Sequence, residues 1–225
     1  MSHVVVVRHD QIVPQGYLED VLPEGTTEVR LDRGDLLPEP DTVAGLVVLG
    51  GTMGAYDEDR FPFLADEKAY LRRAVAAGVP VFGICLGCQL LAEALGGAAY
   101  RARGIEARFG PCDVTEAGAA DPVARHLTRP VLSLHQDTWD PPPGSAVLAW
   151  SDRYPQAFRH GSALGIQAHP EASPEMAAAW LAALGADRLA ATGADPPAIV
   201  GEMVAHRAES RALAHDLFGA WLGRL

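Results

Sequence analysis

One stretch decides the predicted fold: Val81-Phe82-Gly83-Ile84-Cys85-Leu86-Gly87-Cys88-Gln89, residues 81–89. Its first four residues read as a buried strand, and the apolar spacing over residues 86–95 predicts a helix that Gly96-Gly97 ends. Cys85 would then lie on the tight turn between strand and helix, at the carboxyl edge of a sheet. A helix N-terminus favours a thiolate, so Cys85 is a candidate nucleophile, although a free cysteine is often a small buried apolar residue.

Alternating strands and helices also precede this turn. Strands are predicted at residues 4–7, 27–31 and 45–49, and a helix is predicted at residues 65–77. This order indicates an α/β fold with an open, mostly parallel, twisted sheet and helices on both faces.

The pattern changes in the second half of the chain. Short strand-like runs, separated by turns rich in Pro and Gly, predict antiparallel additions to the same sheet at residues 131–134, 146–150, 156–159 and 164–168. From residue 174 the pattern is helical to the end, with a break around residues 193–197. We expect one domain over residues 1–225 with a helical tail over about 175–225.

Apolar residues recur at helical spacing over residues 196–225. They predict a helix that packs on the sheet, and a surface for a dimer or a partner is the alternative. The apolar positions are Ile199, Met203, Leu213, Leu217, Phe218, Trp221 and Leu222.

The composition excludes several classes of protein. The chain has 225 residues, 48% of them hydrophobic, and a formal net charge of −11, which argues against binding to nucleic acid or to anionic membranes. No apolar run approaches the ~20 residues of a membrane span, and no basic segment precedes the apolar run at residues 4–7. We therefore expect a cytoplasmic protein. Three cysteines do not suggest a disulfide framework.

Cys85 and Cys88 form a C-x-x-C pair, which has several interpretations. It could be a redox pair or half of a metal site. A structural zinc site would need a second such pair, which the chain lacks. We expect Cys88, three residues into the helix, to pack against the strand, and we expect no metal.

A glycine loop, Gly50-Gly51-Thr52-Met53-Gly54, follows the third predicted strand. It lacks the spacing and the lysine of a phosphate-binding P-loop, and it could also be a simple turn. The alternative that we favour is half of an oxyanion hole, in which the backbone N–H groups of Gly51 and Leu86 receive a developing negative charge.

A base for the cysteine is predicted in Gly165-Ile166-Gln167-Ala168-His169-Pro170-Glu171. A cysteine nucleophile needs a base, and a carboxylate orients that base. His169 and Glu171 lie two residues apart at a strand end, so both can project from the same edge. Other histidines could serve, and two of them, His206 and His215, are expected to be solvated: His3, His9, His126, His135, His160, His206 and His215.

Together these segments resemble the class I glutamine amidotransferases, whose signature matches residues 83–97, 169–171 and 50–53. Two further segments, Tyr56-Asp57-Glu58 and Ser133-Leu134-His135-Gln136-Asp137, resemble the stand-alone branch similar to the GMP synthetase amidotransferase domain. The second segment equally resembles the γ-glutamyl peptidases. The resemblance implies a flavodoxin-like fold with a Cys-His-Glu triad of Cys85, His169 and Glu171. It also implies substrate contacts from Gly50, Gln89, His135, Gln136 and Asp137, with Asp137 pairing with an α-ammonium group.

The implied activity is hydrolysis of the γ-amide of glutamine through a cysteine thioester, without a cofactor. The ammonia would pass to a separate synthetase in trans. A γ-glutamyl peptide hydrolase with the same chemistry is the alternative, followed by a non-catalytic binding subunit and by a redox protein that uses Cys85 and Cys88.

Overall fold

The computed structural model describes residues 3–225 and contains a large mixed sheet. Its eight strands have the order β2-β1-β3-β4-β10-β9-β8-β6. Neighbours are parallel from β2 to β10 and antiparallel from β10 to β6, which confirms the predicted mostly parallel α/β sheet. The strands are β1 (His3–Arg8), β2 (Thr27–Arg30), β3 (Val43–Val48), β4 (Val81–Ile84), β6 (Asp113–Val114), β8 (Ala146–Trp150), β9 (Pro155–His160) and β10 (Ala163–Ile166).

A separate two-stranded antiparallel sheet pairs β5 (Ala98–Gly110) with β7 (Val131–Asp140). The expectation that residues 131–134 join the main sheet was therefore wrong, and β5 was not predicted at all. The expected antiparallel placement of residues 164–168 was also only half right. Because β9 and β10 form a hairpin, β10 is antiparallel to β9 but runs parallel to β4.

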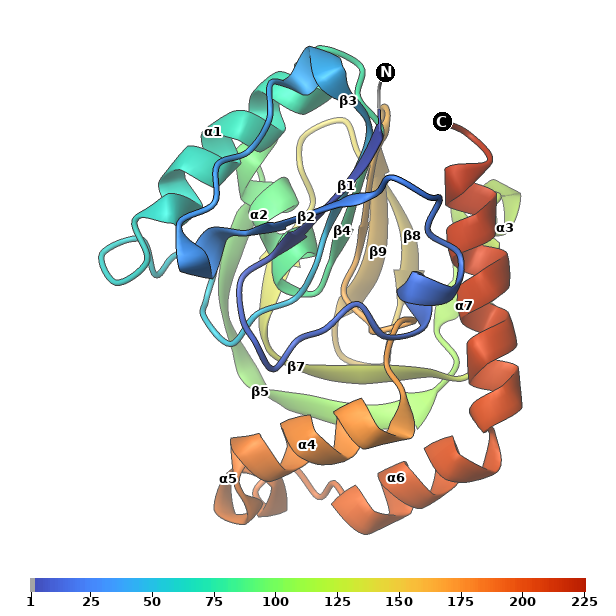
Figure 1. The fold of residues 1–225 in the computed structure, drawn as a ribbon. Coiled ribbons are helices and arrows are strands. Elements are labelled where there is room, and N and C mark those ends of the chain that lie inside the picture. The colour runs from blue at the N-terminus through green and yellow to red at the C-terminus, as the bar shows by residue number, and fades with distance from the viewer. Residues whose placement is uncertain (1–2) are drawn as a thin grey trace.

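Helices cover both faces of the main sheet, as predicted (Figure 1). One face packs on α1 (Phe63–Ala76) and α2 (Leu86–Ala94), and the other packs on α7 (Arg207–Leu222). On the α7 side the ring centroid of Phe82 lies 5.5 Å from that of Phe218 and 5.8 Å from that of Trp221. The shorter elements are α3 (Glu116–Ala120) and 3-10 turns at Gly16–Asp20, Leu31–Arg33, Pro40–Thr42 and Ala124–Thr128.

The single helix predicted over residues 196–225 is instead two helices, α6 (Pro196–Ala205) and α7, which meet at His206. The break follows from the two apolar surfaces that this segment covers. Ile199 and Met203 of α6 join a cluster with α4 (Pro174–Leu184), whereas the apolar side of α7 joins the core of the sheet. Figure 1 places α4, α5 (Ala186–Ala190) and α6 near β5 and β7, at the end toward which the parallel strands run. Within residues 3–225, no helix combines the length and the apolar character that crossing a membrane would take.

The start of α2 lies directly against the strands beneath it. A Cβ added to Gly87 would be 2.1 Å from the carbonyl oxygen of Val48, and one added to Gly83 would be 2.4 Å from the carbonyl oxygen of Gly87. Real Cβ atoms do not come so close to backbone oxygens, so these glycines allow the helix to approach β3 and β4. This approach sets the position of the turn at Cys85.

We expect Gly87→Ala to destabilise the fold by about 1–3 kcal/mol, because the added methyl group forces α2 away from β3. The measurement is the free energy of unfolding in urea. Gly201→Ala is the matched control, because Gly201 lies in α6 with no atom within 4 Å of its added Cβ. That variant should gain up to about 1 kcal/mol from helix propensity. Equal stability of the two variants would contradict the close approach.

Candidate active site

Cys85 occupies the strand-to-helix turn that the sequence predicts. Its backbone has φ 51° and ψ −106°, and it is the one non-glycine residue with positive φ among residues 3–225. Its N–H donates to the carbonyl of Ile166 at the end of β10, at 2.9 Å. Leu86 is the first residue of α2, so its N–H has no acceptor inside the helix. A strained residue at such a turn is typical of a nucleophile elbow.

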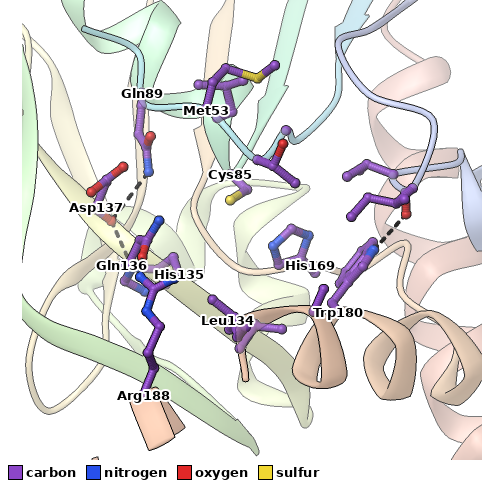
Figure 2. A pocket seen from close by; sticks show the side chains of 17 residues that line it. Met53, Cys85, Gln89, Leu134, His135, Gln136, Asp137, His169, Trp180 and Arg188 are labelled. Carbon is purple, nitrogen blue, oxygen red and sulfur yellow. Dashed lines mark hydrogen bonds between the residues drawn. The ribbon is translucent and has the colours of Figure 1, made fainter. Parts of the chain in front are cut away.

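The neighbouring strand carries His169 and Glu171 to the same place. The chain leaves β10 and the N–H of His169 donates to the carbonyl of Leu132 at 2.7 Å. Nδ1 of His169 then lies 2.7 Å from Oε1 of Glu171, and both side chains are buried. Figure 2 shows the sulfur of Cys85 and the ring of His169 facing each other across the pocket. The structure thus brings the three predicted triad residues together.

The charges around His169 favour its protonated form. Burial alone would lower the pKa of His169, but the Glu171 carboxylate and then the Cys85 thiolate outweigh burial and hold it well above its usual value. The ring of His169 also packs on the ring of Trp180, with 4.8 Å between the ring centroids. The indole N–H of Trp180 donates to the carbonyl of Ile12 at 2.8 Å. Trp180, held by this hydrogen bond, therefore forms the part of the pocket wall beside His169.

The glycine loop lies against Cys85 and His169. A Cβ added to Gly50 would be 3.5 Å from Cε1 of His169 and 3.6 Å from Cβ of Cys85. Gly51, Leu86 and Cys85 line one pocket. The backbone of the loop is therefore close enough to serve a group bound at Cys85, while the oxyanion role of Gly51 and Leu86 stays a prediction.

The other predicted substrate contacts line the same pocket (Figure 2). Nε2 of Gln89 donates to the carbonyl of Asp137 at 3.3 Å and to Oε1 of Gln167 at 3.1 Å. The Asp137 carboxylate accepts a hydrogen bond from the hydroxyl of Tyr56 at 3.1 Å and lies 3.6 Å from the guanidinium of Arg101. Burial raises the pKa of Asp137, although the hydrogen bond from Tyr56 and the charge of Arg101 act to lower it.

His135 and Gln136 are engaged mainly with the protein itself. Nε2 of His135 lies 2.7 Å from Oε2 of Glu106, and Nδ1 lies 2.9 Å from the carbonyl of Asp137. Oε1 of Gln136 accepts a hydrogen bond from Arg188 of α5. His135 therefore shapes the wall of the pocket, because both of its ring nitrogens are occupied.

These geometric findings agree with comparisons to known proteins. The family model "Glutamine amidotransferase class-I" matches residues 22–184. The chain belongs to the class I glutamine amidotransferase family. Among solved structures, a glutamine amidotransferase from Thermotoga maritima is similar over 98% of this chain and 97% of its own, with a TM-score of 0.84 and 28% identity.

Curated relatives of this amidotransferase-family chain carry several names. The glutamine amidotransferase-like protein YfeJ of Salmonella typhimurium is 33% identical over 154 residues, 65% of this chain and 64% of YfeJ. A γ-glutamyl-L-1-hydroxyisopropylamide hydrolase of a Pseudomonas species is 28% identical over 179 residues, 71% of this chain and 60% of the hydrolase. A glutamine-hydrolysing GMP synthase of Thermus thermophilus is 38% identical over 132 residues, 56% of this chain and 24% of the synthase. The matches thus span less than two-thirds of each relative's length.

Cys88 of this amidotransferase-family chain belongs to the core and does not line the pocket at Cys85. It is fully buried in the core on the α1 side, and its sulfur would be 2.8 Å from a Cβ added to Gly165 of β10. Burial, and then the negative charge of Cys85, raise the pKa of Cys88 well above its usual value. This contact with β10 shows that Cys88 packs against the sheet, and both cysteines are free. Within residues 3–225, no three His, Cys, Asp or Glu side chains gather as metal ligands would.

The other histidines considered from sequence have different surroundings. His9 pairs with Glu67, as His135 pairs with Glu106, and the predicted exposure of His206 and His215 is confirmed. Sequence reasoning missed the partners Glu67, Glu106, Tyr56, Trp180 and Arg188. Glu67 and Glu106 lie 58 and 29 residues from their histidines, and no local spacing signals such a pairing.

We expect Glu171→Gln to lower the pKa of His169, because the amide keeps a hydrogen-bond acceptor but removes the negative charge. The measurement is a titration of the His169 ring by NMR. Since the folded-state pKa is raised, protonation of His169 stabilises the fold below the unfolded-state pKa and this contribution is lost as pH rises through the folded-state value. The variant should lose part of that pH dependence.

Glu175→Gln is the control for this titration, since the exposed Glu175 carboxylate pairs with Arg207 and not with His169. It should leave the His169 titration unchanged. An unchanged titration in Glu171→Gln as well would show that Glu171 does not set the charge of His169.

Proposed function

We propose that this protein hydrolyses the γ-amide of glutamine by cysteine-nucleophile catalysis, with residues 1–225 as one cytoplasmic domain. The observation that carries the proposal is the position of Cys85 on a strained turn beside the buried His169–Glu171 pair. Thiolate and imidazolium stabilise each other in such a pair, which supplies an activated nucleophile at neutral pH.

In the first half-reaction the Cys85 thiolate adds to the δ-carbonyl carbon of the substrate. The carbonyl oxygen becomes an oxyanion that accepts hydrogen bonds from the N–H groups of Gly51 and Leu86. The C–N bond then breaks as His169 donates its proton to the leaving nitrogen, so that ammonia departs and a γ-glutamyl thioester forms.

In the second half-reaction water attacks the thioester. Neutral His169 accepts a proton from the water, the oxygen bonds to the acyl carbon, and the sulfur of Cys85 leaves as a thiolate. Glu171 holds the imidazole in one orientation throughout and stabilises its protonated form. Glutamate is released, and the scheme uses no metal or organic cofactor.

The amino-acid end of the substrate would bind at the far side of the pocket. Asp137 is a buried carboxylate that can pair with an α-ammonium group, and Tyr56 holds that carboxylate in place. Gln89 and Gly50 would contact the glutamyl portion. His135 and Gln136 would support this wall, His135 through its bonds to Glu106 and to the carbonyl of Asp137.

Two leaving groups suit this chemistry. With glutamine the product is ammonia, which we propose passes to a separate synthetase in trans, as the similarity to GMP synthases suggests. The second candidate is hydrolysis of γ-glutamyl amides or peptides, which the Pseudomonas relative favours by its name. The apolar pocket wall of Ile12, Val13 and Trp180 would suit a larger leaving group. A non-catalytic binding subunit would have no use for the complete triad.

We expect the purified protein to release glutamate from glutamine or from a γ-glutamyl amide, and Cys85→Ala to abolish this release by at least about 10³-fold, because the covalent step is lost. The measurement is glutamate formed per enzyme with each substrate. Added hydroxylamine should divert the thioester to γ-glutamyl hydroxamate. Cys88→Ala is the matched control and should retain turnover. Turnover that survives in Cys85→Ala would overturn the mechanism.

We expect Asp137→Asn to lower kcat/KM for glutamine roughly 10- to 100-fold, since a charge-assisted hydrogen bond contributes about 1.5–3 kcal/mol. The substrate analogue that lacks the α-amino group should be turned over equally by parent and variant. Asp140→Asn is the control, because Asp140 is exposed three residues further along β7. An equal loss with both substrates would show that Asp137 does not bind the ammonium group.

A further inference from the structure

We propose that His9 and Glu67 form a second His–carboxylate pair, which takes no part in bond making and positions the glycine loop of the active site. The inference rests on the proposed function, and it assigns to His9 the role of a positioning residue. The contact that would do this is the hydrogen bond from Nδ1 of His9 to the carbonyl oxygen of Gly50, at 3.2 Å.

The pair lies deep inside the molecule, between β1 and α1. His9 directly follows β1, Glu67 belongs to α1, and each of the two residues is only 1% exposed. Nε2 of His9 lies 2.9 Å from each carboxylate oxygen of Glu67. The ring also stacks on Phe63 with 6.4 Å between ring centroids. His9 is thus anchored on one nitrogen and presents the other to the glycine loop.

Both nitrogens of His9 face hydrogen-bond acceptors. A carbonyl oxygen can only accept, and so can an ionised carboxylate, so a proton on each ring nitrogen satisfies both contacts. Burial acts to lower the pKa of His9, but the charge of Glu67, the hydrogen bond to Glu67 and the hydrogen bond to Gly50 raise it overall. A charged pair in this position is costly to desolvate and contributes little net stability. Its benefit would lie in the geometry that it imposes.

The peptide between Gly50 and Gly51 links His9 to the reaction. No cis peptide bond occurs within residues 3–225, so the C=O of Gly50 and the N–H of Gly51 point to opposite sides of one plane. The carbonyl points to His9, and therefore the Gly51 N–H points away from His9. That N–H donates to no protein acceptor among the described residues. It stays available for a substrate oxygen at Cys85.

Two consecutive glycines leave this peptide free to rotate unless something anchors it. The hydrogen bond from His9 supplies the anchor, and donation to the carbonyl also polarises the peptide and strengthens the opposite N–H as a donor. Because the oxyanion exists only in the transition state and the intermediate, loss of the anchor should act on kcat and leave KM nearly unchanged.

Two variants of His9 separate this role from simple packing. The amide nitrogen of Asn reaches the place of Nδ1, whereas that of Gln reaches the place of Nε2. His9→Asn therefore keeps a donor for Gly50 and loses the contact with Glu67, and His9→Gln does the reverse. We expect His9→Asn to keep kcat within about 5-fold, and His9→Gln to lose about 10- to 100-fold in kcat at similar KM, less than the 10²- to 10³-fold that deletion of an oxyanion donor costs.

An equal loss in both variants, or no loss in His9→Gln, would overturn the positioning role while leaving Cys85-dependent turnover of the parent intact. Should His9→Gln not fold, His9→Phe removes the donor, keeps an aromatic ring against Phe63 and carries the same expectation.

If the parent itself turns over neither glutamine nor a γ-glutamyl amide, the proposed function fails. The hydrogen bond from His9 to Gly50 is then tested by NMR, through the chemical shift of the Gly51 amide. This resonance should move in His9→Gln and stay in place in His9→Asn. A Gly51 amide that is unmoved in His9→Gln would overturn the inference.

Discussion

The hydrogen bond from the N–H of Cys85 to the carbonyl of Ile166, 2.9 Å long, joins the ends of β4 and β10, and the whole site depends on it. It continues the parallel register in which Ile166 lies beside Ile84. One strand therefore ends at Cys85, the proposed nucleophile, while its neighbour leads directly into His169. If β10 paired elsewhere in the sheet, the two residues would lie at different positions along its edge, and no choice of side chains could bring them together.

The same junction stores strain at Cys85. A non-glycine residue at φ 51° costs on the order of 1–3 kcal/mol, and the surrounding structure must hold it there. That restraint comes from α2, which Gly83 and Gly87 allow to lie against β3 and β4. Once the helix is in contact, relaxing the turn would move its first residues into backbone oxygens. Close backbone packing thus sustains the conformation that exposes the sulfur to the pocket.

Local signals explain what the sequence could predict. The elbow and the His169–Glu171 pair lie within short segments, where apolar runs, glycines and helical spacing are read directly. β5 was missed because Ala98–Gly110 mixes Arg, Glu and Gly and lacks the alternation of a half-buried strand. The separate β5–β7 sheet and the partners of His9 and His135 depend on contacts between distant segments, for which one sequence offers no pattern.

Within residues 3–225, three histidines each pair with a buried carboxylate, yet they differ in the group that their second ring nitrogen contacts. In His135 it meets the carbonyl of Asp137, and in His9 it meets the carbonyl of Gly50. In His169, Nδ1 is held by Glu171, and no oxygen of the described residues occupies Nε2. A histidine with both nitrogens bonded can only hold structure in place, whereas one with a free nitrogen beside a thiol can exchange protons. The contact of the second nitrogen, more than the residue type or the carboxylate partner, therefore distinguishes His169, the proposed base, from His9 and His135.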